Sequence, residues 1–313
     1  LTRTVGTATN RLKFTISTWV KKSQPGTGGN AQQFFNGYYS STYRFLFYFD
    51  QTYNLHILNI DSGTTNVNLQ TTRVLRDPNA WYHVYCAIDT AQATESDRVK
   101  IYINGVQETS FGTATYPAQN ADMALGTSSY TCQIGRYGGD SDYFSGILSH
   151  YYYIDGSIID VGQFGSTDAT TGEWKINTSP TIASYGNEGF LILKDGNTIT
   201  DQSPNSNDFT LGAGTLTNTE DNPSNVFATF NPLDVNKGTV VAFSNGNTTT
   251  MHNSGNNGIV TAARSTLAYS KGKFYWESKC IATGGDVRTG IISMSSSNYN
   301  TSTNPYVLNE CYN

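Results

Sequence analysis

The stretch that decides the fold is residues 81–107, WYHVYCAIDTAQATESDRVKIYINGVQ, which holds two strand patterns separated by a polar loop. In its second half, Val99, Ile101 and Ile103 alternate with polar residues and a tyrosine. This period of two is typical of a strand that buries one of its two faces.

The Asn104-Gly105 pair directly follows this second strand. Asn-Gly tolerates positive φ at both central positions of a type I′ turn, whose twist matches that of the flanking strands. We therefore expect a β-hairpin, with Val106-Gln107 opening the return strand.

The first half of the stretch is apolar or aromatic on both faces. One face would carry Tyr82, Val84, Cys86 and Ile88, and the other Trp81, His83, Tyr85 and Ala87. One interpretation is a central strand of a two-sheet sandwich whose outer face is covered by a loop or a subunit. The other is a concave sheet that offers aromatic rings to a sugar.

Similar strand-like runs recur along the chain, and Gly, Asn and Pro separate them. The runs cover residues 13–21, 43–50, 55–60, 81–89, 99–104, 130–135 and 144–154. Helical periodicity is nearly absent, apart from one short turn expected within SIIDVGQF, residues 157–164. The pattern favours an all-β antiparallel sandwich over alternating βαβ units.

The composition is polar but poorly charged. Charged residues make up 14% of the chain, 21 residues are Tyr, and the formal net charge is -5, whereas soluble proteins average about 25% charged residues. Such surfaces suit adhesins and virion fibres, where Tyr supplies contact area and Asn or Ser supplies hydrogen bonds. No basic cluster exceeds Lys21-Lys22, so a nucleic-acid partner is not expected.

The four cysteines, Cys86, Cys132, Cys280 and Cys311, form no CxxC pair and have no His at zinc-ligand spacing. We expect them to be free and structural, although two disulfides could form in an oxidising compartment. No apolar run approaches 18 residues, so no membrane insertion is expected. The chain opens at Leu1 without a secretory leader, so we expect either processing or a segment of a longer protein.

The chain divides into three regions. Residues 1–165 hold most strand patterns, whereas 166–236 are rich in Asn, Asp, Gly, Ser, Thr and Pro and read as an irregular spacer with one strand, in EGFLILKDG. Alternation returns in 237–313, notably in KGKFYWESKCI from Lys271. A second sandwich is expected to begin there, but about forty residues after Gly272 are too few for a domain of roughly 100 residues. We therefore expect the polypeptide to continue beyond residue 313.

The order of the motifs FTISTWVKKS, WYHVYCAIDT, DRVKIYINGVQ and QIGRYGGDSDYFSGILSHYYYIDG resembles laminin-G-like domains. These are concanavalin A-like, jelly-roll lectin domains carried by structural proteins of tailed bacteriophages. The resemblance covers residues 1–165, and the region after it looks like the spacer that follows such domains. GKFYWESKC and GIISM resemble the opening strands of a SPRY domain, which is another β-sandwich.

The resemblance implies a virion protein, either a tail fibre or a capsid-attached appendage, that presents lectin-like modules to a host surface or its glycans. The alternative is a purely structural capsid or tail decoration protein without a ligand, because this fold hosts lectins, hydrolases and inert spacers alike. Its partners would be other virion proteins and copies of itself, with a trimer as the first expectation.

The acidic residues do not predict an enzyme. A glycosidase needs two carboxylates flanking the bond, and the Glu-x-Asp-x-x-Glu strand of related glucanases is absent. Asp140 and Asp142 alternate in GGDSDYFSG and are candidates for calcium, because this ion takes several carboxylate and carbonyl oxygens. The alternative is that both bond turn amides. We expect His56, His83 and His150 to be packed in strands.

A sugar site would combine aromatic rings with polar neighbours, because rings stack on a pyranose while Asn, Asp and Arg bind its hydroxyls. Two groups qualify: Tyr38, Tyr39 and Tyr43, or Arg136, Tyr137 and Tyr143. The alternative for both is packing between subunits of a fibre.

Overall fold

The computed structural model describes most of the chain. The described residues are 1–23, 31–138, 142–196, 198–212, 214–235, 241–252, 263–281, 287–291 and 308–311. The chain divides into two compact units, Leu1–Phe227 and Ala228–Asn313.

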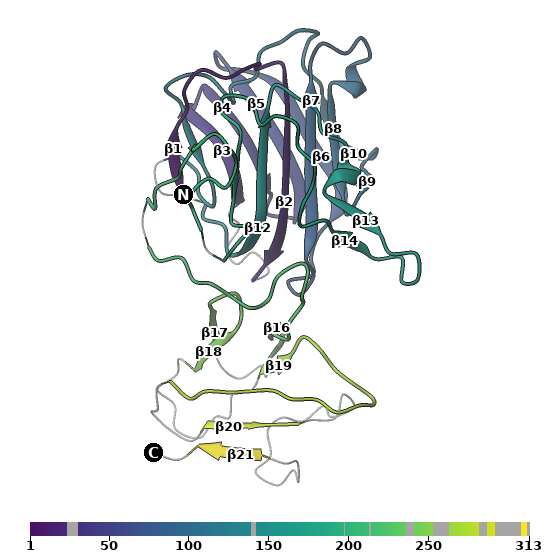
Figure 1. Ribbon diagram of the computed structural model, residues 1–313, viewed down its shortest axis with the longest axis vertical. Helices are drawn as coiled ribbons and strands as arrows, with labels where there is room; N and C mark the ends of the chain where they lie inside the picture. The colour runs from purple at the N-terminus through teal and green to yellow at the C-terminus, as the bar shows by residue number, and fades with distance from the viewer. Residues whose placement is uncertain are drawn as a thin grey trace. The chain divides into compact units, whose positions relative to one another are not determined.

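The first unit is a sandwich of two antiparallel sheets (Figure 1). In spatial order, the seven-stranded sheet comprises β1 (Thr2–Thr4), β11 (Thr131–Gln133), β3 (Gln32–Ser40), β4 (Tyr43–Phe49), β5 (Asn54–Asp61), β6 (Thr64–Val74) and β10 (Phe111–Thr115). The six-stranded sheet comprises β15 (Phe190–Ile192), β12 (Gly146–Asp155), β2 (Lys13–Lys22), β7 (Tyr82–Asp89), β8 (Val99–Ile103) and β9 (Val106–Gln107). The predicted fold class, an all-β antiparallel sandwich, is confirmed.

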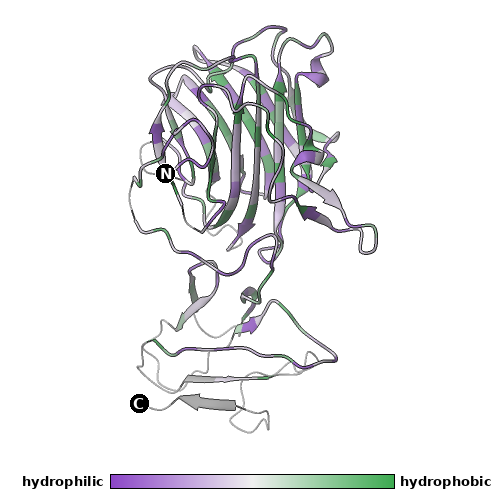
Figure 2. Cartoon of the chain, in the orientation of Figure 1, coloured by the Kyte–Doolittle hydropathy of each residue, from purple (hydrophilic) through white to green (hydrophobic). Residues whose placement is uncertain are grey.

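The main core lies between the two sheets. Alternate residues point inward on each strand, so that Phe14 and Ile16 of β2 meet Phe45 and Phe47 of β4. All four are fully buried, and the rings of Phe14 and Phe45 meet edge to face at 5.7 Å. Figure 2 shows hydrophobic residues concentrated in the strands of this unit. Burying each such side chain contributes about 1.5–3 kcal/mol.

Two long strands of the seven-stranded sheet were not predicted as strands. In β3, the register with β4 shifts between Gln33 and Phe35, so that adjacent Phe34 and Phe35 both enter the core. Such a bulge breaks the alternation that identifies a strand. In β6, Val67 and Leu69 are the buried apolar residues of an otherwise Thr- and Asn-rich run.

The predicted Asn-Gly hairpin is confirmed. Asn104 and Gly105 have φ of 51° and 75°, and β9 returns alongside β8. Gly105 is required for a second reason, because a Cβ atom there would overlap the indole ring of Trp174. That tryptophan comes from a short hairpin, β13 (Gly165–Thr167) with β14 (Trp174–Ile176).

A second apolar cluster covers part of the outer face of the six-stranded sheet. It contains Tyr85, Ala87, Tyr152, Ile154, Phe164 and Leu191, with Tyr102, Ile159, Val161, Ile182 and Tyr185 packed at its margin. The covering residues come from the chain after β12, including the short 3-10 turn Val161–Gln163 that lies within the predicted helical turn. The aromatic outer face of β7 is therefore covered by later chain rather than offered to solvent.

Asp221 adds a buried ion pair to this covered face. Its carboxylate lies 2.5 Å from Lys21 Nζ and accepts a hydrogen bond from Trp81 Nε1 at 3.4 Å. The Lys21 and Asp221 side chains are 2% and 0% exposed. The covering chain is thus anchored to β2 across 200 residues of sequence.

The region predicted as a spacer, residues 166–236, belongs to the first unit as far as Phe227. β15, which lies within the predicted strand EGFLILKDG, pairs with β12 through Tyr151↔Ile192 and its neighbours. Composition marked this region as irregular, but a few buried residues in a polar segment are enough to attach it to a sheet.

The described residues of the second unit form three short strand pairs. These are β16 (Phe230–Val235) with β19 (Ala263–Ser265), β17 (Val241–Ser244) with β18 (Thr249–His252), and β20 (Val287–Gly290) with β21 (Leu308–Cys311). The strand predicted over residues 272–281 is wrong, because these residues have no ladder partner and Phe274 and Trp276 are both 49% exposed. Alternation assigns faces, but a strand also needs a neighbour to pair with. Most of the predicted GIISM motif lies outside the described residues.

Cys86 and Cys132 are free and buried in the main core, as predicted for structural thiols. Burial raises the pKa of the Cys132 thiol to about 12. Within the described ranges, no helix has the length and apolar character needed to cross a membrane.

Candidate functional site

The outer face of the seven-stranded sheet is the main candidate. On β4, Phe45, Phe47 and Phe49 enter the core, so Arg44 and Tyr48 point to the opposite face. Both are partly exposed, in contrast to the outward residues of β2 and β7 on the other sheet. This surface, which we call the open face, extends over β3, β4, β5 and β6.

The first polar-aromatic group on the open face is formed by Tyr38, Arg44 and Tyr137. Tyr38 is the cross-strand partner of Arg44, and its ring meets that of Tyr137 edge to face at 5.4 Å. The Arg44 guanidinium lies 5.7 Å from the centre of the Tyr137 ring and donates a hydrogen bond to the Tyr137 hydroxyl. Burial raises the pKa of the Tyr137 phenol, and Arg44 partly opposes this rise.

A second group crosses three strands. Burial, assisted by the charge of Asp50, raises the pKa of Tyr48 to about 12, so its hydroxyl is a donor. It donates to His56 Nδ1 at 2.6 Å, which leaves Nε2–H of His56 to donate to Asn68 Oδ1 at 2.5 Å. The two rings lie 4.8 Å apart. The rings and polar groups are therefore held in place before any ligand arrives.

The predicted tyrosines divide between two locations. Tyr38 and Tyr137, taken from separate predicted groups, meet on the open face. Tyr39 instead stacks on Tyr130 at 5.0 Å and contacts Tyr43 at 6.4 Å, and Tyr43 packs against the main core. Tyr39 and Tyr43 therefore form a separate cluster.

Arg136 and Tyr143 each contact a residue of β3. The Arg136 carbonyl accepts a hydrogen bond from Asn36, and its guanidinium donates to Gly138 O at 2.8 Å. Tyr143 forms a bridge with Gln33 and is 55% exposed. The structure thus brings Tyr38, Arg136, Tyr137 and Tyr143 to one sheet.

Sequence reasoning missed Arg44, Tyr48 and His56 as members of this surface. The signal was present in YRFLFYF, residues 43–49, where the alternation that buries three phenylalanines also presents Arg44 and Tyr48 on the other side. His56 alternates in the same way with Leu55 and Ile57, which are both in the core.

The predicted calcium residues are only partly described. Asp140 lies outside the described residues, and the Asp142 backbone carbonyl accepts a hydrogen bond from Gln33 N at 3.2 Å. Among the residues that can be assessed, no three His, Cys, Asp or Glu side chains cluster to hold a metal. However, the side-chain oxygens of Gln33, Asn36 and Gln133 are buried and lack a hydrogen-bond partner in the described part of the chain. Such oxygens are ligands that calcium accepts, and Gln33 contacts Asp142 while Asn36 faces Gln133 on the neighbouring strand, so these residues fit a hard cation in type.

Of the three histidines predicted to be packed, His83 and His150 are buried, whereas His56 is partly exposed on the open face. His83 is fully buried and receives a hydrogen bond on Nδ1 from Trp174 Nε1 at 3.2 Å. Its Nε2–H therefore donates to Ser17 Oγ at 2.9 Å. Burial lowers the pKa of His83 to about 3, so the ring is neutral and serves to hold the covering hairpin.

The comparison with protein families agrees with the observed fold. Residues 2–158 match a protein-family model described as the Concanavalin A-like lectin/glucanases superfamily. No curated protein sequence matches the chain.

Three solved structures illustrate the similarity. Domain 4 of the extracellular arabinanase AbnA from Geobacillus stearothermophilus, in complex with arabinotriose, is 18% identical with a TM-score of 0.36, covering 48% of this chain and 64% of that one. The heptameric SAP-like pentraxin of Limulus polyphemus is 13% identical with a TM-score of 0.39. The match covers 62% of this chain and 88% of the pentraxin chain. The enzymatically active domain of tailspike protein 2 of bacteriophage CBA120 is 13% identical with a TM-score of 0.35. The match covers 50% of this chain and 24% of the tailspike chain. The chain thus spans less than two thirds of the arabinanase domain and of the tailspike, and similarity at this level says nothing about ligands.

Proposed function

The chain belongs to the Concanavalin A-like lectin/glucanases superfamily, and on this premise we propose that its open face binds glycans without cleaving them. The observation that carries the proposal is the contact of Tyr38, Arg44 and Tyr137 on one exposed sheet. Two tyrosine rings and a guanidinium are the groups that pack on a sugar ring and bind its hydroxyls.

Arg44 has hydrogen-bonding capacity left for a ligand. A guanidinium carries five N–H donors, and Arg44 directs Nη1 to the Tyr137 hydroxyl. The hydrogen bond and cation–π contact with Tyr137 restrict the guanidinium, so less side-chain freedom remains to be lost on binding.

The line of Tyr48, His56 and Asn68 extends the same surface across β4, β5 and β6. Its polar groups are already joined by hydrogen bonds, so they form a rigid surface. We infer that a chain of several sugar units, rather than a single unit, would fit a face that crosses three strands.

A glycan array tests this proposal. Tyr38→Ala and Tyr137→Ala should each weaken binding by about tenfold or more, since loss of one ring contact of about 1.5 kcal/mol corresponds to that factor. The matched control is Tyr39→Ala, which removes a neighbouring ring that stacks on Tyr130 away from the open face. Equal binding by all three variants would refute the site, and absence of binding to every glycan would refute the function.

In the wider protein, the proposed role is that of a phage virion appendage, a tail fibre or capsid-attached fibre, that meets host-surface glycans as a homo-oligomer, with a trimer as the first expectation. Support comes from the low charge and high Tyr content. Electron microscopy of intact particles with this chain traced would test the location, and light scattering would test the oligomer. Release of reducing ends from host polysaccharide would contradict a role limited to binding.

The alternative is a purely structural decoration module. The observation that favours it is the exposure of Tyr39 and Tyr143, at 62% and 55%, because Tyr-rich surfaces also pack between subunits. Burial of the open face against capsid or tail neighbours in a particle would select this alternative.

Calcium remains part of the proposal. Gln33, Asn36 and Gln133 would supply amide oxygens, and Asp142 a carboxylate, to an ion that satisfies these buried acceptors. Calcium in excess of its Kd should raise the melting temperature, and Asn36→Leu should abolish the rise. An unchanged melting temperature in calcium and in chelator would remove the ion from the proposal.

A further inference from the structure

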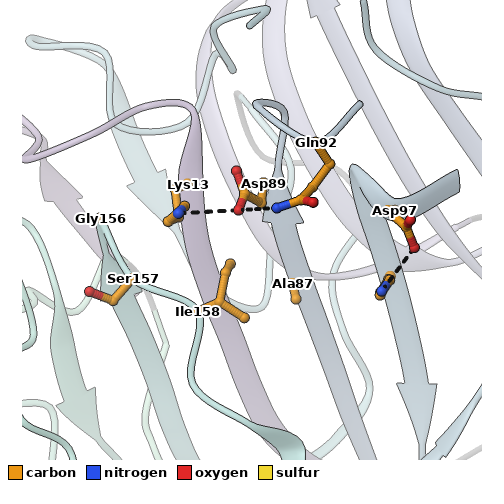
Figure 3. Close-up of a pocket in the computed structure, with 9 residues that line it drawn as sticks. Lys13, Ala87, Asp89, Gln92, Asp97, Gly156, Ser157 and Ile158 are labelled. Atoms are coloured by element: carbon orange, nitrogen blue, oxygen red, sulfur yellow. Dashed lines mark hydrogen bonds and ion pairs between the residues drawn. The ribbon is translucent and has the colours of Figure 1, made fainter. Parts of the chain in front are cut away.

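A shallow cleft of about 500 Å³ lies on the outer face of the six-stranded sheet (Figure 3). It occupies the end of the sheet where β2 begins and β7 ends, beside the segment that follows β12. Ala87 of β7 lies in its middle and Ile158 faces it from the opposite wall. Next along β7, Tyr85 is covered by Phe164 at 6.0 Å, so the covering chain closes the cleft at that end.

Four charged side chains line the cleft as two ion pairs. Lys13 Nζ lies 3.2 Å from Asp89 Oδ2, and Lys100 Nζ lies 3.0 Å from Asp97 Oδ1. Gln92 Nε2 also donates to Asp89 Oδ2 at 2.8 Å. Two cations therefore face two anions, and the lining has no net charge.

The carboxylate of Asp89 is held in its charged form. Burial alone would raise its pKa, but hydrogen bonds from Gln92 and Lys13 outweigh this effect and lower the pKa below its ordinary value. The pairing of Lys13 with Asp89 therefore persists at neutral pH.

The ion pairs leave capacity for a ligand. An ammonium has three N–H donors, and within the described ranges each of the two lysines has a single carboxylate partner. The Asp97 side chain is 46% exposed, so it can accept further hydrogen bonds. Ile158, which is 39% exposed, and Ala87 add apolar contact surface.

We propose that this cleft is a second saccharide site, for a neutral polyhydroxylated sugar unit. Neighbouring sugar hydroxyls can accept from an ammonium and donate to a carboxylate at the same time, which matches a lining of paired Lys and Asp. An acidic sugar would add an unbalanced charge beside Asp89 and Asp97. The apolar side of the ring would rest against Ile158. The site is separate from the open face, so this proposal goes beyond the glycan proposal made above and can be tested independently of it.

The test is amide NMR of the full ¹⁵N-labelled chain, titrated with the methyl glycosides of glucose, galactose and mannose and with glucuronate. We expect saturable shifts of the Ala87, Gln92 and Ser157 amides with at least one neutral glycoside, and weaker binding of glucuronate. The double variant Asp97→Ala/Lys100→Ala keeps the net charge and should weaken this binding by about tenfold or more, as expected for losing charge-assisted hydrogen bonds.

The matched control is Asp168→Ala/Lys175→Ala, which removes an exposed Lys–Asp pair with a 2.6 Å separation outside the cleft and should bind normally. A dispersed spectrum for each variant establishes that it is folded. Shifts confined to the surroundings of Tyr38 and Tyr137 would overturn this inference and leave the open-face proposal intact, whereas equal shifts in the Asp97→Ala/Lys100→Ala variant would overturn it directly. Tighter binding of glucuronate would overturn the assignment to neutral sugars, and no shift anywhere with any of the four sugars would count against both sites.

Discussion

The two outer faces of the sandwich differ in what lies over them. On the six-stranded sheet, Tyr85 and His83 are covered by Phe164 and Trp174 from later in the chain. On the seven-stranded sheet, Tyr48 and His56 are partly exposed and bonded mainly to one another. Aromatic residues on the outside of a strand therefore serve packing on one face and remain available for recognition on the other. The following predictions test that distinction.

The largest effect is expected at the ion pair of the covered face. Asp221→Ala would leave the Lys21 ammonium buried without its carboxylate, and should lower the free energy of unfolding by about 3–5 kcal/mol, measured by urea denaturation. Lys21→Met/Asp221→Leu should recover much of the loss, because neither charge then remains. As a control, Asp168→Asn breaks an exposed pair and should hardly move the midpoint. A small effect of Asp221→Ala would mean that the covered face is not held by this pair.

The next effect concerns the Asn-Gly turn beneath the covering hairpin. Gly105→Ala places a side chain at positive φ and displaces the Trp174 ring, and should cost about 2 kcal/mol in total. Trp174 fluorescence should report greater solvent exposure, although three other tryptophans contribute to the signal. Gly63→Ala, at φ 79° in an exposed turn, provides the control for the backbone cost alone.

Stability should fall in mild acid because of His83. Its folded pKa of about 3 lies below the unfolded value near 6.5, so between these values the unfolded chain binds a proton that the folded chain does not. The free energy of unfolding should therefore decrease as the pH falls from 6.5, by about 1.4 kcal/mol per pH unit. His150, whose pKa is lowered to about 4 by burial, adds to the same trend. His83→Gln should flatten the profile, and an unchanged profile would contradict a neutral, sealed imidazole.

The smallest effect on stability is expected on the open face. Tyr143→Ala removes a ring that is 55% exposed, and should change the free energy of unfolding by no more than about 0.5 kcal/mol. Tyr85→Ala, on the covered face, should cost several times more, because it leaves a cavity. Comparable losses for the two variants would mean that the open face is packed rather than free.

Much of the fold was predictable because one physical pattern determines it. Alternation identified β2, β4, β5, β7 and β8, and the Asn104-Gly105 turn followed from the backbone preference of its two residues. β3 was not predicted as a strand because its bulge places the adjacent residues Phe34 and Phe35 on the same side. For residues 272–281 the opposite error occurred. Alternation predicted a strand there, but these residues pair with no neighbouring strand in the described part of the chain.

The candidate site was predictable only in part. Aromatic composition pointed to Tyr38 and Tyr137, but their meeting with Arg44 depends on which segment crosses β3. The covering of β7 by Phe164 and Trp174 was equally hidden, because a local pattern contains no information about what a segment some eighty residues later will contact.

The pairing of Lys21 with Asp221 also bears on how the protein is made. On the ribosome, Lys21 emerges 200 residues before its partner, an interval on the order of 10–40 s at the usual rates of synthesis. Trp81, His83 and Tyr85 are covered only as Phe164, Trp174 and Asp221 emerge in turn, so until then the nascent chain presents an exposed aromatic surface to chaperones and to its neighbours. A ribosome that stalls before adding Asp221 would hold a nascent chain in which this surface is not yet fully covered.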